Sequence, residues 1–211
     1  MEGISTYVLY GSGRLKPHKT EIEHAVANAV KLISEKIPLS DIDIVAFDYP
    51  FSTREGMGIG GYADPNTVWT SLDPAFLDFN KVISEEIRRT LAHELHHCIR
   101  TRGPGYGWTL FEAMISDGLA DHFVIEMWGK PPYPWDTALT RTQRERLLKR
   151  AKRVWNRRVY DNRWFGGKKS KDIPKWTGYS IGFWLVGQYL SKHPTESAAS
   201  LVSAPAERFT Q

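Results

Sequence analysis

The sequence predicts an α+β fold in which a small N-terminal sheet is followed by a mostly helical C-terminal part. Segments with strand composition occur only in the first 72 positions, where they are short and bounded by glycine or other turn residues. After about residue 80, apolar residues recur at helical spacing over long segments. Strands therefore come first and helices later, which is the pattern of the α+β class.

The length of the chain, 211 residues, fits one domain. We therefore expect residues 1–211 to form a single domain. Its α/β part is expected over about residues 1–100 and its helical part over about residues 105–211.

Five elements are expected before residue 80. Tyr7–Tyr10 is a short apolar run that ends at a Gly-Ser-Gly turn and predicts the first strand. Pro17–Ile37 has apolar residues three and four positions apart and predicts a helix that ends before a proline. Asp41–Phe47 begins with alternating acidic and apolar residues and predicts a second strand. Gly56–Gly61 has four glycines in six residues and predicts a flexible turn, and Thr67–Leu72 has strand composition.

The remainder of the chain predicts helices. They are expected over Asn80–Arg100, Thr109–Trp128, Leu139–Arg158 and Tyr179–Lys192. A glycine-proline-glycine run at residues 103–105 should end the first of them. Phe165–Lys171 is rich in glycine and lysine and is expected to form a surface loop.

The composition is that of an ordinary globular protein, with 41% hydrophobic and 25% charged residues. No segment approaches the roughly 18–20 apolar residues of a membrane span. The N-terminal residues show no basic region followed by an apolar run, so we expect no secretory signal and a cytoplasmic location. The single cysteine, Cys98, would point about 100° away from His97 on a helix, which predicts a buried free thiol and not a ligand.

Positive charge is concentrated in one segment. Arg141–Lys175 has 14 Lys or Arg against 3 acidic residues, a local charge of +11 that leaves −7 for the rest of the chain. Such a surface could bind nucleic acid, an acidic protein or anionic lipid. The simpler interpretation is a solvated helix over Leu139–Arg158 with an apolar inner face.

His93-Glu94-Leu95-His96-His97 is the most informative motif of the chain. In a helix, residues four apart lie on one face, about 6 Å apart along the axis. His93 and His97 can therefore bind one metal ion, and Glu94 would lie beside that ion, where it can take a proton from a metal-bound water. This arrangement is typical of catalytic zinc. His96 is then expected to support the ligands or to face solvent.

A catalytic zinc ion needs a third protein ligand and an open fourth position. The following helix offers five candidates: Glu112, Asp117, Asp121, His122 and Glu126. Thr109 and Glu112 have the spacing of a capping box, so Glu112 is expected to cap the helix and is only the fallback ligand. Asp117 and Asp121 share a face, so one can bind the metal while the other accepts a proton from a ligand imidazole. Gly118 is expected to let the two helices approach closely.

The motif and the downstream run Asp117-Gly118-Leu119-Ala120-Asp121 resemble the gluzincin metallopeptidases. In that group the third zinc ligand is a glutamate on a following helix, and an aspartate four residues later supports the first histidine. The resemblance therefore implies a zincin-like fold with His93, His97 and Asp117 as zinc ligands and Asp121 as a supporting residue.

The chain is most similar to a family of predicted zinc-dependent proteases known as a domain of unknown function, in which Glu-Gly-Leu-Ala follows the histidine motif. The similarity covers about residues 56–192 and includes Gly60-Gly61-Tyr62 and the segment from Gly178 to Gly182. One position departs from the family pattern, because Asp117 stands where that family usually has glutamate. Aspartate binds zinc in other metallopeptidases, so the site is expected to be retained.

The resemblance also suggests uses for other segments. In gluzincins an edge strand ahead of the metal helix binds the extended substrate, and Thr67–Leu72 stands in that place. Gluzincins also use a tyrosine or histidine that donates a hydrogen bond to the oxyanion. Tyr179 is the candidate for this catalytic role, and Tyr106 and His193 are weaker alternatives. The structural alternatives are an ordinary edge strand and a Tyr179 that only packs between helices.

Together these residues predict a zinc metallopeptidase that hydrolyses peptide bonds through a zinc-bound water, with Zn²⁺ as the cofactor and Glu94 as the general base. A peptide or protein substrate is expected, and no membrane partner. The alternative is a non-proteolytic zinc-binding or regulatory module that acts through Arg141–Lys175. Glu94 argues against it, because a structural zinc site needs no general base. Nucleic acid is not expected as a partner because no readout motif is recognisable, and the oligomeric state is open.

Overall fold

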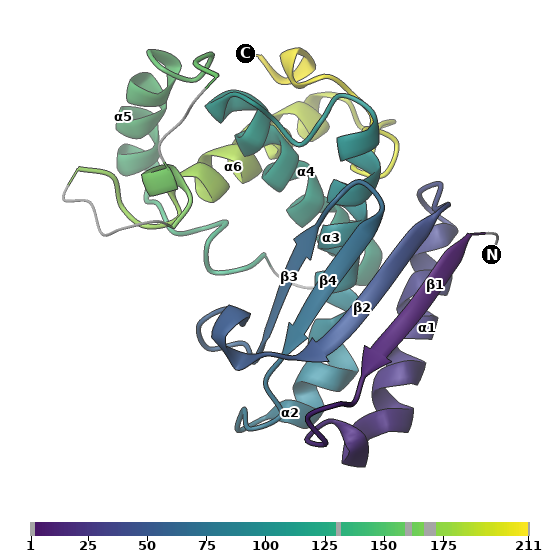
Figure 1. Ribbon diagram of the computed structural model, residues 1–211. Helices are drawn as coiled ribbons and strands as arrows, with labels where there is room; N and C mark the ends of the chain where they lie inside the picture. Colours follow the sequence, from purple (N-terminus) through teal and green to yellow (C-terminus); the bar gives the residue numbers. More distant parts are fainter. Residues whose placement is uncertain (1–2, 130–131, 159–161, 167–171, 211) are drawn as a thin grey trace. The chain divides into compact units, whose positions relative to one another are not determined.

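The computed structural model describes residues 3–129, 132–158, 162–166 and 172–210 and confirms the α+β class (Figure 1). The chain divides into two compact units, Met1–Ile99 and Arg100–Gln211. All strands of the described chain belong to the first unit, and the second is helical. Most of the loop expected over Phe165–Lys171 lies outside the described residues.

A four-stranded mixed sheet forms the centre of the first unit (Figure 1). Its strands are β1 (Ile4–Leu9), β2 (Ile42–Asp48), β3 (Ile59–Ala63) and β4 (Thr67–Leu72), in the order β1-β2-β4-β3. β1, β2 and β4 are parallel, and β3 runs antiparallel to β4. On β4, Val68 is fully buried whereas Trp69 is 39% exposed. The sheet therefore has one face in the core and one face with exposed aromatic side chains.

Two expectations for this sheet are wrong. Gly60 and Gly61 were expected in a turn, but both lie in β3. A side chain at Gly60 would collide with the backbone carbonyl of Ser52, so the close approach of another segment explains this glycine. Thr67–Leu72 is a strand, as predicted, but it is β4 and lies between β2 and β3, so the edge strands of the sheet are β1 and β3.

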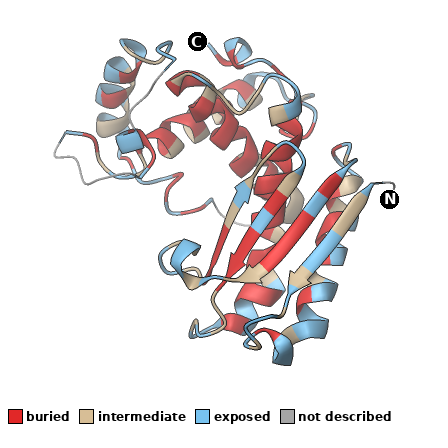
Figure 2. Cartoon of the chain, viewed as in Figure 1, coloured by how far each residue is buried: buried red, intermediate tan, exposed pale blue. Residues whose placement is uncertain are grey.

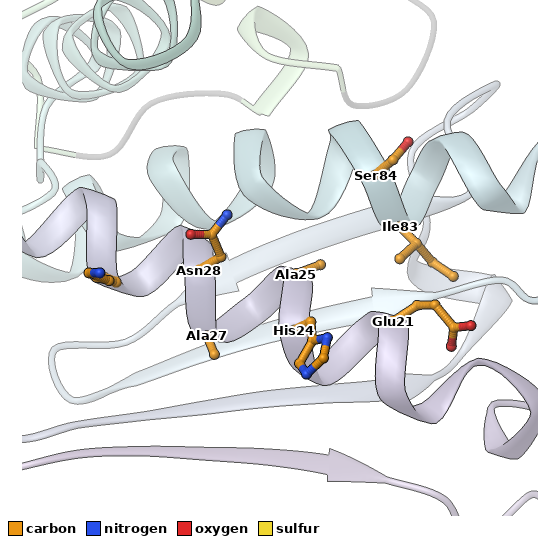
Figure 3. Close-up of a pocket in the computed structure, with 8 residues that line it drawn as sticks. Glu21, His24, Ala25, Ala27, Asn28, Ile83 and Ser84 are labelled. Carbon is orange, nitrogen blue, oxygen red and sulfur yellow. The ribbon is translucent and has the colours of Figure 1, made fainter.

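Helix α1 (Lys19–Ser34) connects β1 to β2, as a parallel pair requires. It follows the short helix η1 (Lys16–His18) and buries an apolar stripe that consists of Ile22, Val26, Ala29, Val30 and Ile33. Residues of α1 and of the segment Val82–Glu86 line a surface groove of about 600 Å³ (Figure 3). The groove contains Glu21, His24 and Lys31 but lies apart from the histidine motif in the sequence.

The helix that carries the motif is preceded by an irregular turn. After the short helix η2 (Pro50–Ser52), β3 and β4, the chain enters α2 (Phe79–Lys81), a π-helical turn η3 (Val82–Glu86) and α3 (Ile87–Arg102) without a break. The helix predicted over Asn80–Arg100 is therefore confirmed. The π-helical turn was not predicted; it rotates every later side chain around the axis relative to an uninterrupted α-helix.

The second unit contains α4 (Leu110–Trp128), α5 (Arg141–Lys152) and α6 (Thr177–Lys192), with short turns η4 (Asn162–Trp164) and η5 (Ala206–Phe209). Most of α4 is buried (Figure 2). Its backbone touches that of α6, because a Cβ atom on Gly118 would lie 2.5 Å from the carbonyl group of Gly182. Gly118 therefore allows α4 to approach α6.

Helix α5 is shorter than the predicted Leu139–Arg158. It ends at Lys152, because the chain then turns so that the carbonyl oxygen of Trp155 accepts a 3.0 Å hydrogen bond from the backbone N–H of Phe111. The two rings also contact each other, with centroids 4.5 Å apart. The apolar inner face is confirmed, since Leu147 and Ala151 are buried.

Arg100 joins three segments of the second unit. Its side chain is buried, and burial lowers its pKa to about 10, so it remains charged at neutral pH. Nε donates to Ser116 Oγ at 2.9 Å, and Nη1 donates to the carbonyl oxygens of Val202 at 3.2 Å and Ala204 at 2.7 Å. The C-terminal segment is thus part of the core of this unit.

None of the helices in the described ranges is long and apolar enough to cross a membrane.

Candidate metal centre

Helix α3 brings two imidazole groups together. His93 and His97 are four residues apart and are 4% and 5% exposed. Their Nε2 atoms are 2.9 Å apart, and the rings meet edge to face. Two nitrogen ligands at about 2.05 Å from a tetrahedral zinc ion are about 3.3 Å apart. The two side chains therefore need only a small adjustment to share one ion.

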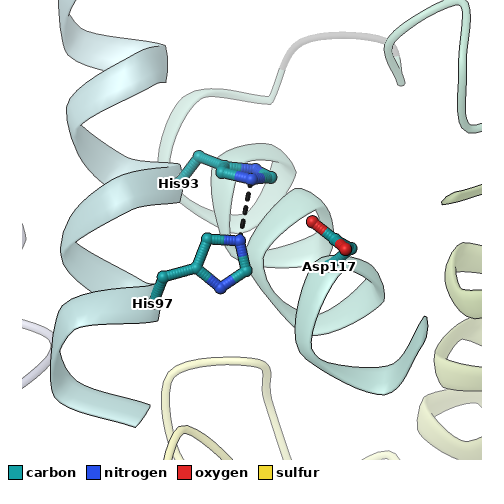
Figure 4. Close-up of side chains that lie close together, drawn as sticks. All are labelled: His93, His97 and Asp117. Atoms are coloured by element: carbon teal, nitrogen blue, oxygen red, sulfur yellow. Dashed lines mark hydrogen bonds between the residues drawn. The ribbon is translucent and has the colours of Figure 1, made fainter. Parts of the chain in front are cut away.

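Asp117 on α4 completes a group of three possible ligands. One ligand atom from each of His93, His97 and Asp117 can be chosen so that all lie within 4.8 Å of one another (Figure 4). Two imidazole nitrogens and one carboxylate oxygen form a donor set that suits zinc. All three residues are buried, which favours a bound cation over a solvated acidic patch.

Tyr106 fixes the orientation of Asp117. Its hydroxyl group donates a 2.8 Å hydrogen bond to Oδ2 of Asp117. Tyr106 was considered from the sequence only as a weaker oxyanion donor. Its contact with Asp117 instead gives it a function in holding a carboxylate, which no local pattern could have indicated because the two residues belong to different segments.

The capping function of Glu112 is confirmed. Its Oε2 accepts hydrogen bonds from the backbone N–H groups of Trp108 and Thr109, both at 2.8 Å, and Thr109 Oγ1 accepts from the N–H of Glu112 at 3.2 Å. The carboxylate is thus occupied at the start of α4, where it also interacts favourably with the helix dipole.

The two later candidates on α4 have structural contacts. The ring of His122 stacks on that of Phe183, its Nε2 is 2.9 Å from the carbonyl oxygen of Phe183, and burial lowers its pKa. Glu126 accepts a hydrogen bond from the backbone N–H of Ala199. Both side chains therefore tie α4 to its neighbours within the second unit.

Glu94, the expected general base, packs against the backbone of β3. It is 4% exposed, and a Cβ atom on Gly61 would lie 2.5 Å from both Cγ and Oε1 of Glu94. The neighbouring Tyr62 has a raised pKa, mainly because it donates to Asp64, with a smaller contribution from the charge of Glu94. Gly61 is therefore needed for the observed position of the carboxylate.

Gly61→Ala is expected to displace Glu94. If Glu94 acts as a general base, a misplacement of about 1 Å would slow the reaction by about 100-fold. Zinc content should not change, because the ligands are not touched. Stopped assays of peptide hydrolysis and elemental analysis measure the two quantities. Gly11→Ala is the matched control, since nothing lies within 4 Å of the added methyl group; equal activity of both variants would contradict the assignment.

Other predicted residues have clear locations. His96 is fully buried, so the alternative in which it faces solvent is wrong. Cys98 is buried as predicted, with Sγ 3.1 Å from the carbonyl oxygen of Pro65. Tyr179 contacts the rings of Phe165 and Trp135, with centroids 5.1 and 6.3 Å away.

His193, a weaker oxyanion candidate, lies at the C-terminal end of α6. Its ring stacks on that of Tyr189, and its Nδ1 is 2.9 Å from the carbonyl oxygen of Tyr189. These contacts account for its position as a helix-terminal packing residue.

Asp121 is one turn after Asp117 on α4 and is 1% exposed. Its Oδ2 accepts a 3.2 Å hydrogen bond from Trp135 Nε1. Next to Trp135, Asp136 is also buried. Asp136 was missed in the sequence, where it follows proline and tryptophan residues and has no motif around it.

The mixed sheet and the histidine pair on a buried helix define the chain as an α+β protein with a candidate metal site. It belongs to the family described as Predicted Zn-dependent protease (DUF2268), whose model matches residues 22–211. It is also 30% identical over 167 residues to the Uncharacterized protein YjaZ of Bacillus subtilis (strain 168). That similarity covers 75% of this chain and 59% of the relative, so the chain spans less than two thirds of the relative's length.

Proposed function

We propose that this protein is a zinc-dependent peptidase in which His93, His97 and Asp117 hold the metal ion. The observation that carries the proposal is the 2.9 Å approach of the two imidazole nitrogens on one buried helix. The grouping with Asp117 and the description of the family as predicted Zn-dependent proteases support it. Three protein ligands leave a fourth coordination position for the reaction.

When bound, zinc would lower the pKa of a water molecule and polarise the scissile carbonyl group. Glu94 takes a proton from the attacking water and transfers it to the leaving amine. Gly61 keeps the carboxylate of Glu94 in place, and Tyr106 keeps Asp117 oriented by its hydrogen bond. No covalent intermediate with the protein is needed.

Two further residues have proposed functions at this site. Asp121 accepts a hydrogen bond from a ligand imidazole and so fixes its orientation, as such carboxylates commonly do. Tyr179 donates a hydrogen bond to the developing oxyanion. Its contacts with Phe165 and Trp135 are compatible with both this function and a packing function.

The substrate is an extended peptide that pairs with the edge strand β3. Among the described residues the strand order gives β3 one neighbouring strand, β4. The N–H of Arg54 already donates to the carbonyl oxygen of Ile59 at the start of β3, so a peptide would pair with the later part of the strand. Gly61 lies on this strand and borders Glu94, which would bring a paired peptide close to the general base. This proposal replaces the earlier assignment of the edge to Thr67–Leu72.

A second candidate function is a non-proteolytic module that binds an acidic partner. The observation that favours it is the exposed side of α5, which carries Arg141, Arg146, Lys149, Arg150 and Lys152. A non-proteolytic module would give the buried carboxylate of Glu94 beside Gly61 no function, so the peptidase is preferred. Binding to acidic peptides by a protein that cleaves none would support the module instead.

The proposal is tested by measuring zinc content and peptide cleavage on the same preparation. We expect about one zinc ion per chain by elemental analysis and cleavage of members of a broad peptide library, detected by mass spectrometry. A chelator should stop cleavage, and added zinc should restore it. A preparation without stoichiometric zinc would refute the site, whereas a zinc-loaded protein that cleaves nothing would refute only the activity.

Asp117→Ala should reduce zinc affinity by more than the 10–100-fold that loss of a supporting residue costs. Glu112→Ala should leave zinc affinity unchanged and lower the stability of the protein by about 1 kcal/mol, because it removes part of a helix cap. Competition with a chromogenic chelator measures the affinity, and urea unfolding measures the stability. If Glu112→Ala lost zinc affinity and Asp117→Ala kept it, the third ligand would be Glu112 instead of Asp117.

A further inference from the structure

A turn after α4 brings a second buried carboxyl group to Asp121. The turn is closed by a 3.0 Å hydrogen bond from the N–H of Asp136 to the carbonyl oxygen of Tyr133. Oδ2 of Asp136 accepts a 2.8 Å hydrogen bond from the N–H of Tyr133. Asp136 is 3% exposed and Asp121 is 1% exposed, so neither carboxyl group is solvated.

The carboxyl groups of Asp121 and Asp136 lie within hydrogen-bonding reach of each other. Ionised carboxylates only accept hydrogen bonds, so this contact requires a proton on one of the pair. Burial, with a contribution from the charge of Asp121, raises the pKa of Asp136 to about 10. We assign the proton to Asp136, because its Oδ1 is buried and meets no donor in the described part of the chain, whereas Asp121 accepts from Trp135 Nε1.

Each carboxyl group of the pair also accepts a hydrogen bond from another donor. Asp121 accepts from Trp135 Nε1 on Oδ2, while one oxygen of Asp136 is used by the backbone of Tyr133. The other oxygen, Oδ1, has no N–H or O–H donor within the described part of the chain, as expected for an oxygen that itself carries the proton. The turn thus delivers two donors, Trp135 and Asp136, to one carboxylate.

We infer that Asp136 is a positioning residue whose neutral carboxyl group donates a hydrogen bond to Asp121 and fixes the orientation in which Asp121 supports the metal ligands. This inference rests on the proposed zinc site. Asp136 does not belong to the group of possible ligands formed by His93, His97 and Asp117. It acts through Asp121, one helical turn after Asp117 on α4.

The test compares Asp136→Asn with Asp136→Leu. Asparagine keeps the shape, donates to Asp121 through its amide group and accepts from Tyr133, whereas leucine keeps a similar volume without these bonds. Zinc affinity is measured by competition with a chromogenic chelator, and the visible spectrum of the cobalt-substituted protein reports ligand geometry. Asp172→Asn, an exposed change in the same unit, is the matched control.

We expect Asp136→Asn and the control to bind zinc within about threefold of the wild type and to keep its cobalt spectrum. Asp136→Leu should bind zinc about 10–100-fold more weakly, with an altered spectrum, as for loss of other residues that support metal ligands. An equal loss of zinc affinity in Asp136→Asn and Asp136→Leu would show that Asp136 acts as an ionised carboxylate, and this would overturn the inference. Unchanged zinc affinity in the leucine variant would also overturn it.

A metal-free measurement separates this inference from the zinc site. Urea unfolding of the apo protein is compared for Asp121→Asn, Asp136→Leu and the double variant. If the two residues act as a pair, the shift of the midpoint in the double variant will be smaller than the sum of the single shifts. Additive shifts would refute the pairing even if zinc binds, and coupled shifts in a protein without zinc would refute only the proposed function.

Discussion

Glu94→Gln is expected to lower peptide hydrolysis by about 10²–10⁴-fold while the protein keeps its zinc. Glutamine has nearly the same shape as glutamate but cannot take a proton from water, so the general-base contribution is lost and the fold is retained. The buried position of Glu94 against Gly61 leaves little room for another group to replace it. Cleavage rates on a library-derived peptide, with zinc content measured in parallel, give the result.

The matched comparison is His97→Ala. This variant should lose zinc and activity together, whereas Glu94→Gln should lose activity alone. If the glutamine variant remained as active as the wild type, the proposed mechanism would be wrong even with zinc in the site. If it lost zinc, Glu94 would have to be reassigned as a ligand.

Gly182→Ala is expected to destabilise the second unit by about 3 kcal/mol, at the upper end of the usual cost of overpacking. The added methyl group would overlap the backbone carbonyl group of Met114 on α4, and neither backbone can move without separating α4 from α6. A loss of this size is a large fraction of the stability of a typical domain. Urea or thermal unfolding followed by circular dichroism measures it.

Gly187→Ala provides the control on the same helix. A methyl group there would meet only the end of the His122 side chain, at 3.2 Å. Because alanine favours helix by about 1 kcal/mol relative to glycine, its expected effect is small or slightly stabilising. Similar stabilities of the two variants would show that α4 and α6 do not pack backbone to backbone as described.

The sequence predicted what depends on near neighbours along the chain. The histidine pair follows from helical spacing, and the cap formed by Thr109 and Glu112 follows from a three-residue interval; both are present. The strand over Thr67–Leu72 is also present, but its place inside the sheet is decided by pairing with distant segments.

What the sequence could not predict depends on contacts between distant segments. Gly61 is needed because Glu94 lies against it, and Asp136 is relevant because the chain folds back onto Asp121. Neither position has a local pattern that separates it from an ordinary turn residue. Helical periodicity also gave no sign of the π-helical turn before α3, since η3 buries apolar residues as a regular helix would.

The hydrogen bonds of Arg100 have a consequence for the order of synthesis. The guanidinium group is buried in the middle of the chain's length, yet two of its acceptors, Val202 and Ala204, are among the last ten residues described. Until those residues leave the ribosome, the second unit lacks partners for a buried charge. Since Ser116, the third partner of Arg100, directly precedes Asp117, we expect the proposed metal site to be completed only after the segment around Val202 and Ala204 has been synthesised. Until then the nascent chain would carry the proposed site in an incomplete form.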